Sequence, residues 1–209
     1  MRNPDDVRDQ VLQSSMPMVM APVFGQLPTL AVGAKRLIAA NDGIYIEMRT
    51  PVLWACQLVQ AMPMPYGQQQ AFLNLKHGPM LAPALSLFMR QAAQACPNEH
   101  AAMVVADQQG YDLQALSIAS STPVSVTYCQ EDIDDDALVI DIHSHGDLDA
   151  FFSNTDDESD LSRRGPYIAV VVGKCRTLNT AQSMARLVSP PYLIPLDWRT
   201  IQQAGYIRD

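Results

Sequence analysis

One strand-like segment that ends in a group of polar side chains constrains the fold more than any other part of the chain. Residues 137–142 (ALVIDI) are apolar and rich in β-branched residues, which predicts a buried strand. His143-Ser144-His145 follows directly. Because alternate side chains of a strand share a face, both imidazoles are expected to point the same way.

Two more polar residues follow these histidines at short range, Ser153 and Asp156. A carboxylate that arrives from a following turn would complete a set of two histidines and one carboxylate. Three protein ligands with a fourth position open to water are the pattern of a catalytic zinc site, whereas a structural site is closed by four protein ligands. The spacing therefore indicates a catalytic metal centre.

A hydrolytic zinc site also needs a group that takes and returns a proton, and a carboxylate that does not bind the metal commonly does this. Glu99 is the favoured candidate because it lies between a predicted helix and a predicted strand at 101–106, a junction that can face a neighbouring strand. Glu47 in the N-terminal region competes with it. Glu131 and Glu158 lie in acidic segments whose positions are less defined.

The order of predicted elements indicates an α/β protein. Residues 80–95 carry apolar side chains alternately four and three positions apart, which predicts an amphipathic helix. A short helix is predicted at 159–164. Strands are predicted at 101–106, within 113–128, and at 137–142, 167–172, 181–188 and 192–196. This order predicts a mixed β-sheet flanked by helices.

The first 75 residues differ from the rest of the chain in residue composition and pattern. Methionines and prolines crowd residues 16–28, which predicts an irregular lead-in. Asn41-Asp42-Gly43 separates two strand-like runs and predicts a hairpin. We therefore predict a small β-rich N-terminal unit of unknown role at 1–75 and a second domain at 76–209.

Charge and composition exclude several classes of protein. The net charge is -8, and Lys and Arg are not clustered as direct nucleic-acid binding requires. The acidic runs at 131–136 and 147–160 are expected to be solvated loops. No apolar run approaches the ~20 residues that cross a bilayer, and the N-terminus does not resemble a signal peptide. The four cysteines are scattered without a CxxC pair, so free thiols in a cytoplasmic protein are expected.

Some polar residues near the histidines have two possible roles. Asp141 alternates in phase with both imidazoles, so it either orients one of them or is a polar residue at a solvated strand position. Asp157 either belongs to an acidic loop or orients a ligand. Ser144 points to the opposite face and is expected to be structural. His77 and His100 have no partners at metal-ligand spacing and are not expected to bind a metal.

The spaced set His143-x-His145-x7-Ser153-x2-Asp156 resembles the JAMM signature of the JAB/MPN metallopeptidases. In that family a glutamate lies upstream, after a helix and before a hydrophobic strand, and QACPNEHAAMVVA places Glu99 at this position. The resemblance implies the cytidine-deaminase-like α/β sandwich of the family. It also implies that both histidines and Asp156 bind one zinc ion per chain, that Glu99 is the general acid and base, and that Ser153 stabilises the oxyanion.

The resemblance covers about residues 80–190 and implies a zinc-dependent peptidase or isopeptidase. The substrate implied is the C-terminal tail of a ubiquitin-like or sulfur-carrier protein, an extended peptide that can add a strand beside the site. The segments SNTDDESD, DGIYIE and MPYG also resemble the A protein of the bacterial PRTRC cassette. That cassette encodes ubiquitin-like and ThiF-related components, which implies an E1-like partner.

Two other functions are compatible with such a fold. A noncatalytic scaffold or partner-binding module would be expected to have lost ligands, but every motif position is filled here. A DNA-processing accessory protein is the other alternative, and the net charge of -8 counts against direct contact with DNA.

Overall fold

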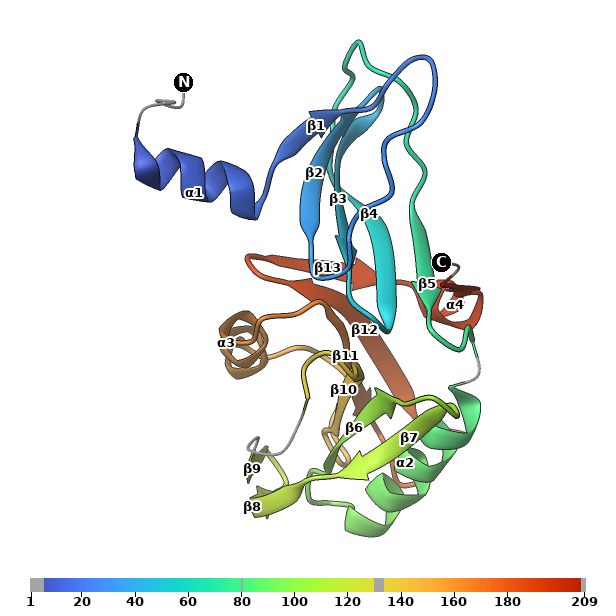
Figure 1. Cartoon of the computed structure of the whole chain (residues 1–209). Helices are drawn as coiled ribbons and strands as arrows, with labels where there is room; N and C mark the ends of the chain where they lie inside the picture. The colour runs from blue at the N-terminus through green and yellow to red at the C-terminus, as the bar shows by residue number, and fades with distance from the viewer. Residues whose placement is uncertain (1–5, 80, 130–133, 208–209) are drawn as a thin grey trace.

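Two six-stranded sheets form the frame of the molecule (Figure 1). The computed structural model describes residues 6–79, 81–129 and 134–207. The upper sheet in Figure 1 has the strand order β1-β2-β3-β4-β5-β14. Its strands are β1 (Met18–Met20), β2 (Lys35–Ala40), β3 (Gly43–Arg49), β4 (Leu53–Ala61), β5 (Phe72–Leu75) and β14 (Gly205–Tyr206).

The second sheet has the order β13-β12-β11-β10-β6-β7 and mixes parallel with antiparallel pairing. β10 runs parallel to β11, and the other neighbours are antiparallel. Its strands are β6 (Ala101–Ala106), β7 (Tyr111–Ala115), β10 (Leu138–Ser144), β11 (Tyr167–Gly173), β12 (Gln182–Ser189) and β13 (Tyr192–Leu196). A separate hairpin consists of β8 (Ser117–Thr122) and β9 (Ser125–Cys129).

Helices α2 (Ala82–Ala95) and α3 (Asn154–Ser162) lie on opposite sides of the second sheet (Figure 1). α2 buries Ala84, Phe88 and Ala92, as the apolar spacing predicted. α4 (Trp198–Gln202) lies next to β5. The predicted α/β fold with a mixed sheet, helices and a β-rich N-terminal region is therefore confirmed.

One hydrophobic core joins the two sheets. Met48 and Leu53 of the upper sheet belong to the same buried cluster as Phe88 of α2 and Val170 of the second sheet. β14 pairs in parallel with β5, so the C-terminal part of the chain completes the N-terminal sheet. The two units thus share their interior, and the boundary at residues 75 and 76 stays a prediction.

The local predictions differ from the structure mainly in the acidic segments. The hairpin at Asn41-Asp42-Gly43 is confirmed, since Ala40 pairs with Gly43. The short helix predicted at 159–164 was wrong in extent: α3 begins at Asn154, so half of the acidic segment 147–160, which was expected to be a solvated loop, is helical. Residues 131–133 of the other acidic run lie outside the described residues.

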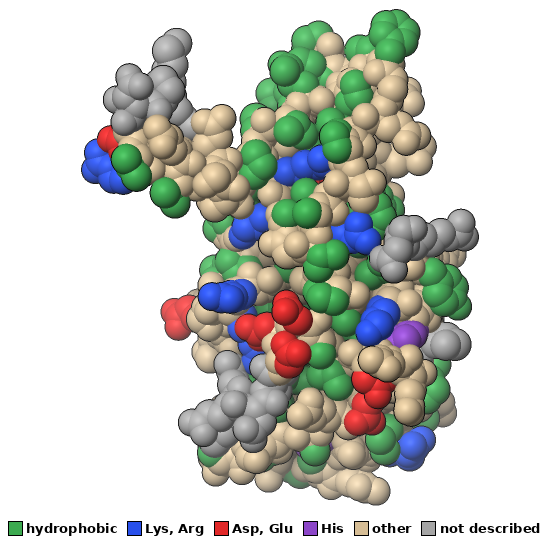
Figure 2. Space-filling view, in the orientation of Figure 1, with side chains coloured by type: hydrophobic (Ala, Val, Ile, Leu, Met, Phe, Trp, Pro, Cys, Tyr) green, Lys and Arg blue, Asp and Glu red, His purple; other side chains and the backbone are tan. Residues whose placement is uncertain are grey.

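The N-terminal helix α1 (Val7–Ser15) stands away from the rest of the molecule and buries no side chain (Figure 1). In the space-filling view, hydrophobic side chains are spread over the upper part of the molecule, which the N-terminal sheet forms (Figure 2). Among the described residues, no helix has the length and apolar character needed to cross a membrane.

Candidate metal centre

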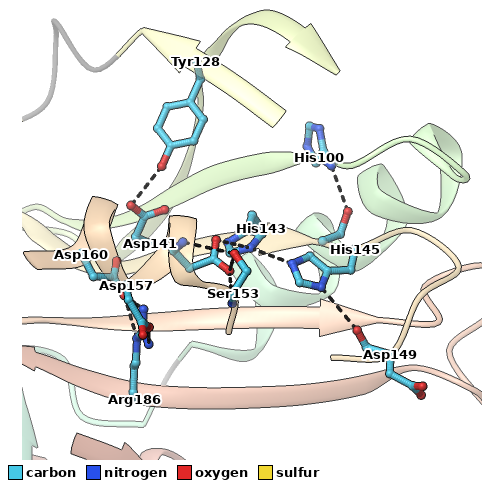
Figure 3. Close-up of polar contacts among 12 residues, drawn as sticks. His100, Tyr128, Asp141, His143, His145, Asp149, Ser153, Asp157, Asp160 and Arg186 are labelled. Atoms are coloured by element: carbon cyan, nitrogen blue, oxygen red, sulfur yellow. Dashed lines mark hydrogen bonds and ion pairs between the residues drawn. The ribbon is translucent and has the colours of Figure 1, made fainter. Parts of the chain in front are cut away.

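The end of β10 brings two imidazoles together beside the sheet. His143 pairs with Ala101 of β6 on one side and with Val171 of β11 on the other, so its strand is central in the sheet. The Nε2 atoms of His143 and His145 lie 3.2 Å apart. The expectation that both rings point the same way is therefore confirmed (Figure 3).

A main-chain contact orients His145. Its Nδ1 lies 3.3 Å from the carbonyl oxygen of Asp149 (Figure 3). Because a carbonyl only accepts hydrogen bonds, this contact favours the tautomer with the proton on Nδ1 and leaves the lone pair on Nε2. The ring of Phe151 packs edge-on against His145 at 4.6 Å between centroids. Burial lowers the pKa of His145, so the neutral ring that a metal requires is favoured.

Asp156 reaches the histidines from the first turn of α3. Ser153 is the N-cap of this helix, and the two residues form a capping box. Asp156 Oδ2 accepts hydrogen bonds from the Ser153 N–H at 2.6 Å and the Ser153 hydroxyl at 2.7 Å. Its other oxygen, Oδ1, lies 3.2 Å from His143 Nε2. One oxygen is thus held by the cap while the other faces the imidazoles.

Electrostatics couple His143 to Asp156. Burial alone would raise the pKa of Asp156, but its hydrogen bonds to His143 and Ser153 hold that pKa well below its usual range. Burial would lower the pKa of His143, yet the hydrogen bond and charge of Asp156 raise it above the ordinary value. A metal needs the lone pair of the imidazole, so metal binding to the protonated form of His143 would release a proton.

The spacing of these three ligand atoms fits a zinc ion. The candidate ligand atoms of His143, His145 and Asp156 all lie within 4.8 Å of one another. Nitrogen and oxygen ligands lie about 2.0–2.1 Å from zinc, which places neighbouring atoms of a tetrahedral site about 3.3 Å apart. The two 3.2 Å separations match this value. The residues present therefore suit a three-ligand zinc site.

Glu99 lies on the same side of the sheet as the histidines. It precedes β6 by two residues, and Ala101 is the partner of His143 in the register. The hairpin holds its main chain: the Glu99 N–H donates to the Thr122 carbonyl at 2.9 Å, and the Ser121 hydroxyl donates to the Glu99 carbonyl at 2.6 Å. Glu99 is only 6% exposed, and this burial raises the pKa of its carboxyl group.

Ser144 connects the two strands that carry these groups. Its hydroxyl accepts a hydrogen bond from the His100 N–H at 2.9 Å, and its own N–H donates to the His100 carbonyl at 2.8 Å. The side chain is fully buried. The expected structural role of Ser144 agrees with these contacts, which tie the segment of Glu99 to the end of β10.

The side chains of the candidate metal centre line one cavity of about 320 Å³. Glu99, His143, His145, Ser153 and Asp156 line it together. Apolar side chains from the hairpin and from the loop before α3 form much of the remaining wall: Val124, Val126, Leu148, Phe151 and Phe152. The cavity therefore combines a cluster of polar side chains, those of the candidate metal centre, with a largely apolar wall. Substrate-binding sites commonly have this composition.

The other candidate glutamates lie elsewhere. Glu47 is buried in the N-terminal sheet, where it accepts hydrogen bonds from Arg36 at 2.7 Å and from the Trp54 indole at 2.9 Å. Glu158 is exposed on α3. Glu131 falls outside the described residues. Of the three candidates within the described residues, Glu99 is the one that lines the cavity.

The two remaining histidines have other partners. His77 Nε2 lies 2.9 Å from the Asp107 carbonyl, and His100 stacks on Phe88 and lies 3.3 Å from Gln91 Oε1. Neither belongs to the group of metal-ligating atoms found among the described residues. That neither histidine binds a metal stays a prediction.

Several charged residues near the site have roles that the sequence did not indicate. Asp141 is buried rather than solvated, and its carboxylate contacts Arg163 at 3.2 Å and the Tyr128 hydroxyl at 3.3 Å. Asp157 forms an ion pair with Arg186 of β12 (Figure 3).

The capping role of Ser153 could have been predicted from the Ser-x-x-Asp spacing. The position of Arg186 could not, because no local pattern connects it to the histidines.

Comparison with known families adds two matches. The family model described as prokaryotic homologs of the JAB domain matches residues 81–187, about half of the chain and including every residue of the candidate metal centre. A model described as a domain of unknown function (DUF2016) matches residues 6–76, most of the N-terminal sheet. The chain has no match among the curated proteins compared with it.

Proposed function

The chain belongs to the prokaryotic homologs of the JAB domain, and we propose that it is a zinc-dependent peptidase or isopeptidase. The observation that carries this proposal is the convergence of His143, His145 and Asp156 beside a buried glutamate in one cavity. A scaffold would not need this combination of three ligand atoms at zinc spacing and a nearby carboxyl group.

Glu99 supplies the proton transfer in this proposal. A bound zinc ion would lower the pKa of a water molecule towards ~7 and would polarise the scissile carbonyl. Glu99 takes a proton from the attacking water and delivers it to the leaving amine. Burial raises the pKa of its carboxyl group, which makes the carboxylate a better proton acceptor than an exposed glutamate.

Ser153 has two tasks in the proposed reaction. In the structure its hydroxyl donates to Asp156 Oδ2, and a hydroxyl has a single proton to donate. To stabilise an oxyanion, the hydroxyl must rotate away from Asp156 and towards the substrate. The Ser153 N–H, 2.6 Å from the same oxygen, continues to hold the carboxylate while this occurs.

The substrate proposed is the flexible C-terminal tail of a ubiquitin-like or sulfur-carrier protein. Apolar residues of two segments line the cavity: Val124 and Val126 of the hairpin, and Leu148 and Phe151 of the loop before α3. An extended tail with small side chains suits such a groove, and it can pair its main chain with a strand edge. The resemblance to the PRTRC A protein supports an E1-like (ThiF-related) partner in the same pathway.

The test uses a fusion protein joined through the C-terminal Gly-Gly of a ubiquitin-like domain. We expect the purified protein to carry one zinc ion, to cleave this fusion, and to lose activity with a chelator and regain it with zinc. The matched control is the same fusion with the Gly-Gly pair replaced by bulky residues. A protein that binds no zinc and stays inactive after zinc addition would instead support the noncatalytic scaffold.

A further inference from the structure

Helix α3 delivers Asp156 to the metal centre, yet it has no apolar face with which to pack. Its sequence is NTDDESDLS, and its one buried residue is a carboxylate, Asp160. Surface helices are ordinarily held by an apolar stripe that faces the core. Because α3 has none, charged contacts must fix its position on the sheet.

Arg186 of β12 makes the central contacts with this helix (Figure 3). Its side chain is only 7% exposed. Its Nε donates a hydrogen bond to Asp160 Oδ2 at 2.7 Å, and its Nη1 forms an ion pair with Asp157. The guanidinium also lies over the ring of Phe152, 3.8 Å from the centroid, immediately before the cap of α3.

A second ion pair holds the C-terminal end of α3, and here the helix supplies the cation and the sheet the carboxylate. Arg163, the C-cap residue, contacts Asp141 of β10 at 3.2 Å. The Tyr167 hydroxyl donates to Asp160 Oδ1 at 2.7 Å, so both oxygens of that carboxylate are bonded. In the sheet register, Ala169 lies between Asp141 and Arg186, and its small side chain leaves space above the sheet for the helix.

These contacts fix the rotation of α3 about its own axis. Asp157 and Asp160 are three residues apart, and Asp156 and Asp160 are four apart, so all three lie near one another on the helix surface. A guanidinium that holds Asp157 and Asp160 therefore sets the direction in which Asp156 projects. The fork of an Arg suits two carboxylates better than the single ammonium of a Lys.

We propose that Arg186 is a positioning residue of the metal centre, which holds α3 in the rotation that presents Asp156 Oδ1 to His143. This inference rests on the proposed metal-dependent function. Buried ion pairs lose much of their attraction to desolvation and contribute little to stability on balance. The ion-pair cluster of Arg186, Asp157 and Asp160 thus has its main effect on geometry, and hence on metal affinity.

The test compares the metal affinity of folded variants in the absence of any substrate. We expect Arg186→Gln to weaken zinc binding by about tenfold to a hundredfold, the range found when a group that orients a metal ligand is removed. Arg186→Lys should recover part of the loss. Arg36→Gln is the matched control because it breaks a similarly buried Arg–Glu pair in the N-terminal sheet, and its zinc affinity should equal that of the wild type.

Cobalt substitution adds a spectroscopic measure, since the visible absorption of Co²⁺ reports ligand geometry. We expect an altered cobalt spectrum in Arg186→Gln and the wild-type spectrum in Arg36→Gln. Should Arg186→Gln fail to fold, Asp157→Asn serves instead, since the Asp157 side chain is 45% exposed. Wild-type affinity and spectrum in the folded variant would overturn this inference alone, whereas no metal binding by the wild type would contradict the proposed function as well.

Discussion

The two carboxylate oxygens of Asp156 make different contacts. Oδ2 accepts both hydrogen bonds from Ser153 and thereby begins α3, while Oδ1 faces His143 at 3.2 Å. The carboxylate that completes the capping box is therefore also the proposed metal ligand. This arrangement orients the carboxylate before any metal arrives, since the cap needs no ion to form.

Ser153→Ala tests this double role. The substitution removes the hydroxyl cap and one bond to Asp156 but keeps the main-chain N–H. We expect a loss of about 1 kcal/mol in the free energy of unfolding, and about tenfold weaker zinc binding. Both quantities can be measured on the same protein, by denaturant titration and by competition with a chelator.

Ser162→Ala is the control for this prediction, because Ser162 lies at the other end of α3 and its hydroxyl donates to the carbonyl of Ser159. It should change neither quantity appreciably. Zinc affinity equal to that of the wild type in Ser153→Ala would show that the cap does not orient the ligand.

The individual residues of the site could be predicted where the signal is local. Alternation along one strand placed His143 and His145 on one side, and the junction between a helix and a strand favoured Glu99. The ion-pair partners of Asp141 and Arg186 could not be predicted, because they lie in or next to α3 and meet these strands only when the helix packs on the sheet. No local sequence pattern indicates which charged residue of a helix will pair with which residue of a strand.

At the scale of elements, two glycines allow the segments around the site to approach closely. Gly146 has a φ of +54°, and a Cβ there would lie 2.1 Å from the Pro97 carbonyl oxygen. A Cβ on Gly173 would lie 2.2 Å from the main-chain nitrogen of Ala150. The first contact joins the loop after His145 to the segment before Glu99, and the second packs the loop before α3 against the end of β11.

The strands and α2 could be predicted because their hydrophobic periodicity is strong, whereas α3 was predicted too short. Its polar sequence lacks the 3.6-residue period, and the ion pairs with β12 that hold it are long-range. The hairpin of β8 and β9 likewise combines strands that could be predicted locally with a tertiary contact that could not. Two strands broken near Pro123 were predicted, but their contact with the Glu99 main chain depends on tertiary structure.

At the scale of the whole molecule, the two sheets share one hydrophobic core, and β14 completes the N-terminal sheet from the other end of the chain. Such sharing couples the unfolding of both parts. We expect a single cooperative transition in calorimetry, with the calorimetric enthalpy equal to the van't Hoff enthalpy. Two resolved transitions would show instead that residues 6–76 and the matched region at 81–187 unfold independently.

The proposed hydrolysis depends on the buried carboxylate of Glu99 beside a bound zinc ion, and Glu99→Gln removes that carboxylate. The amide is close in size to the carboxyl group but cannot accept the proton. The measurement compares bound zinc and the rate of Gly-Gly fusion cleavage in wild type and variant. We predict one zinc ion per chain in both proteins and no detectable cleavage by Glu99→Gln, whereas wild-type cleavage by the variant would contradict the assignment.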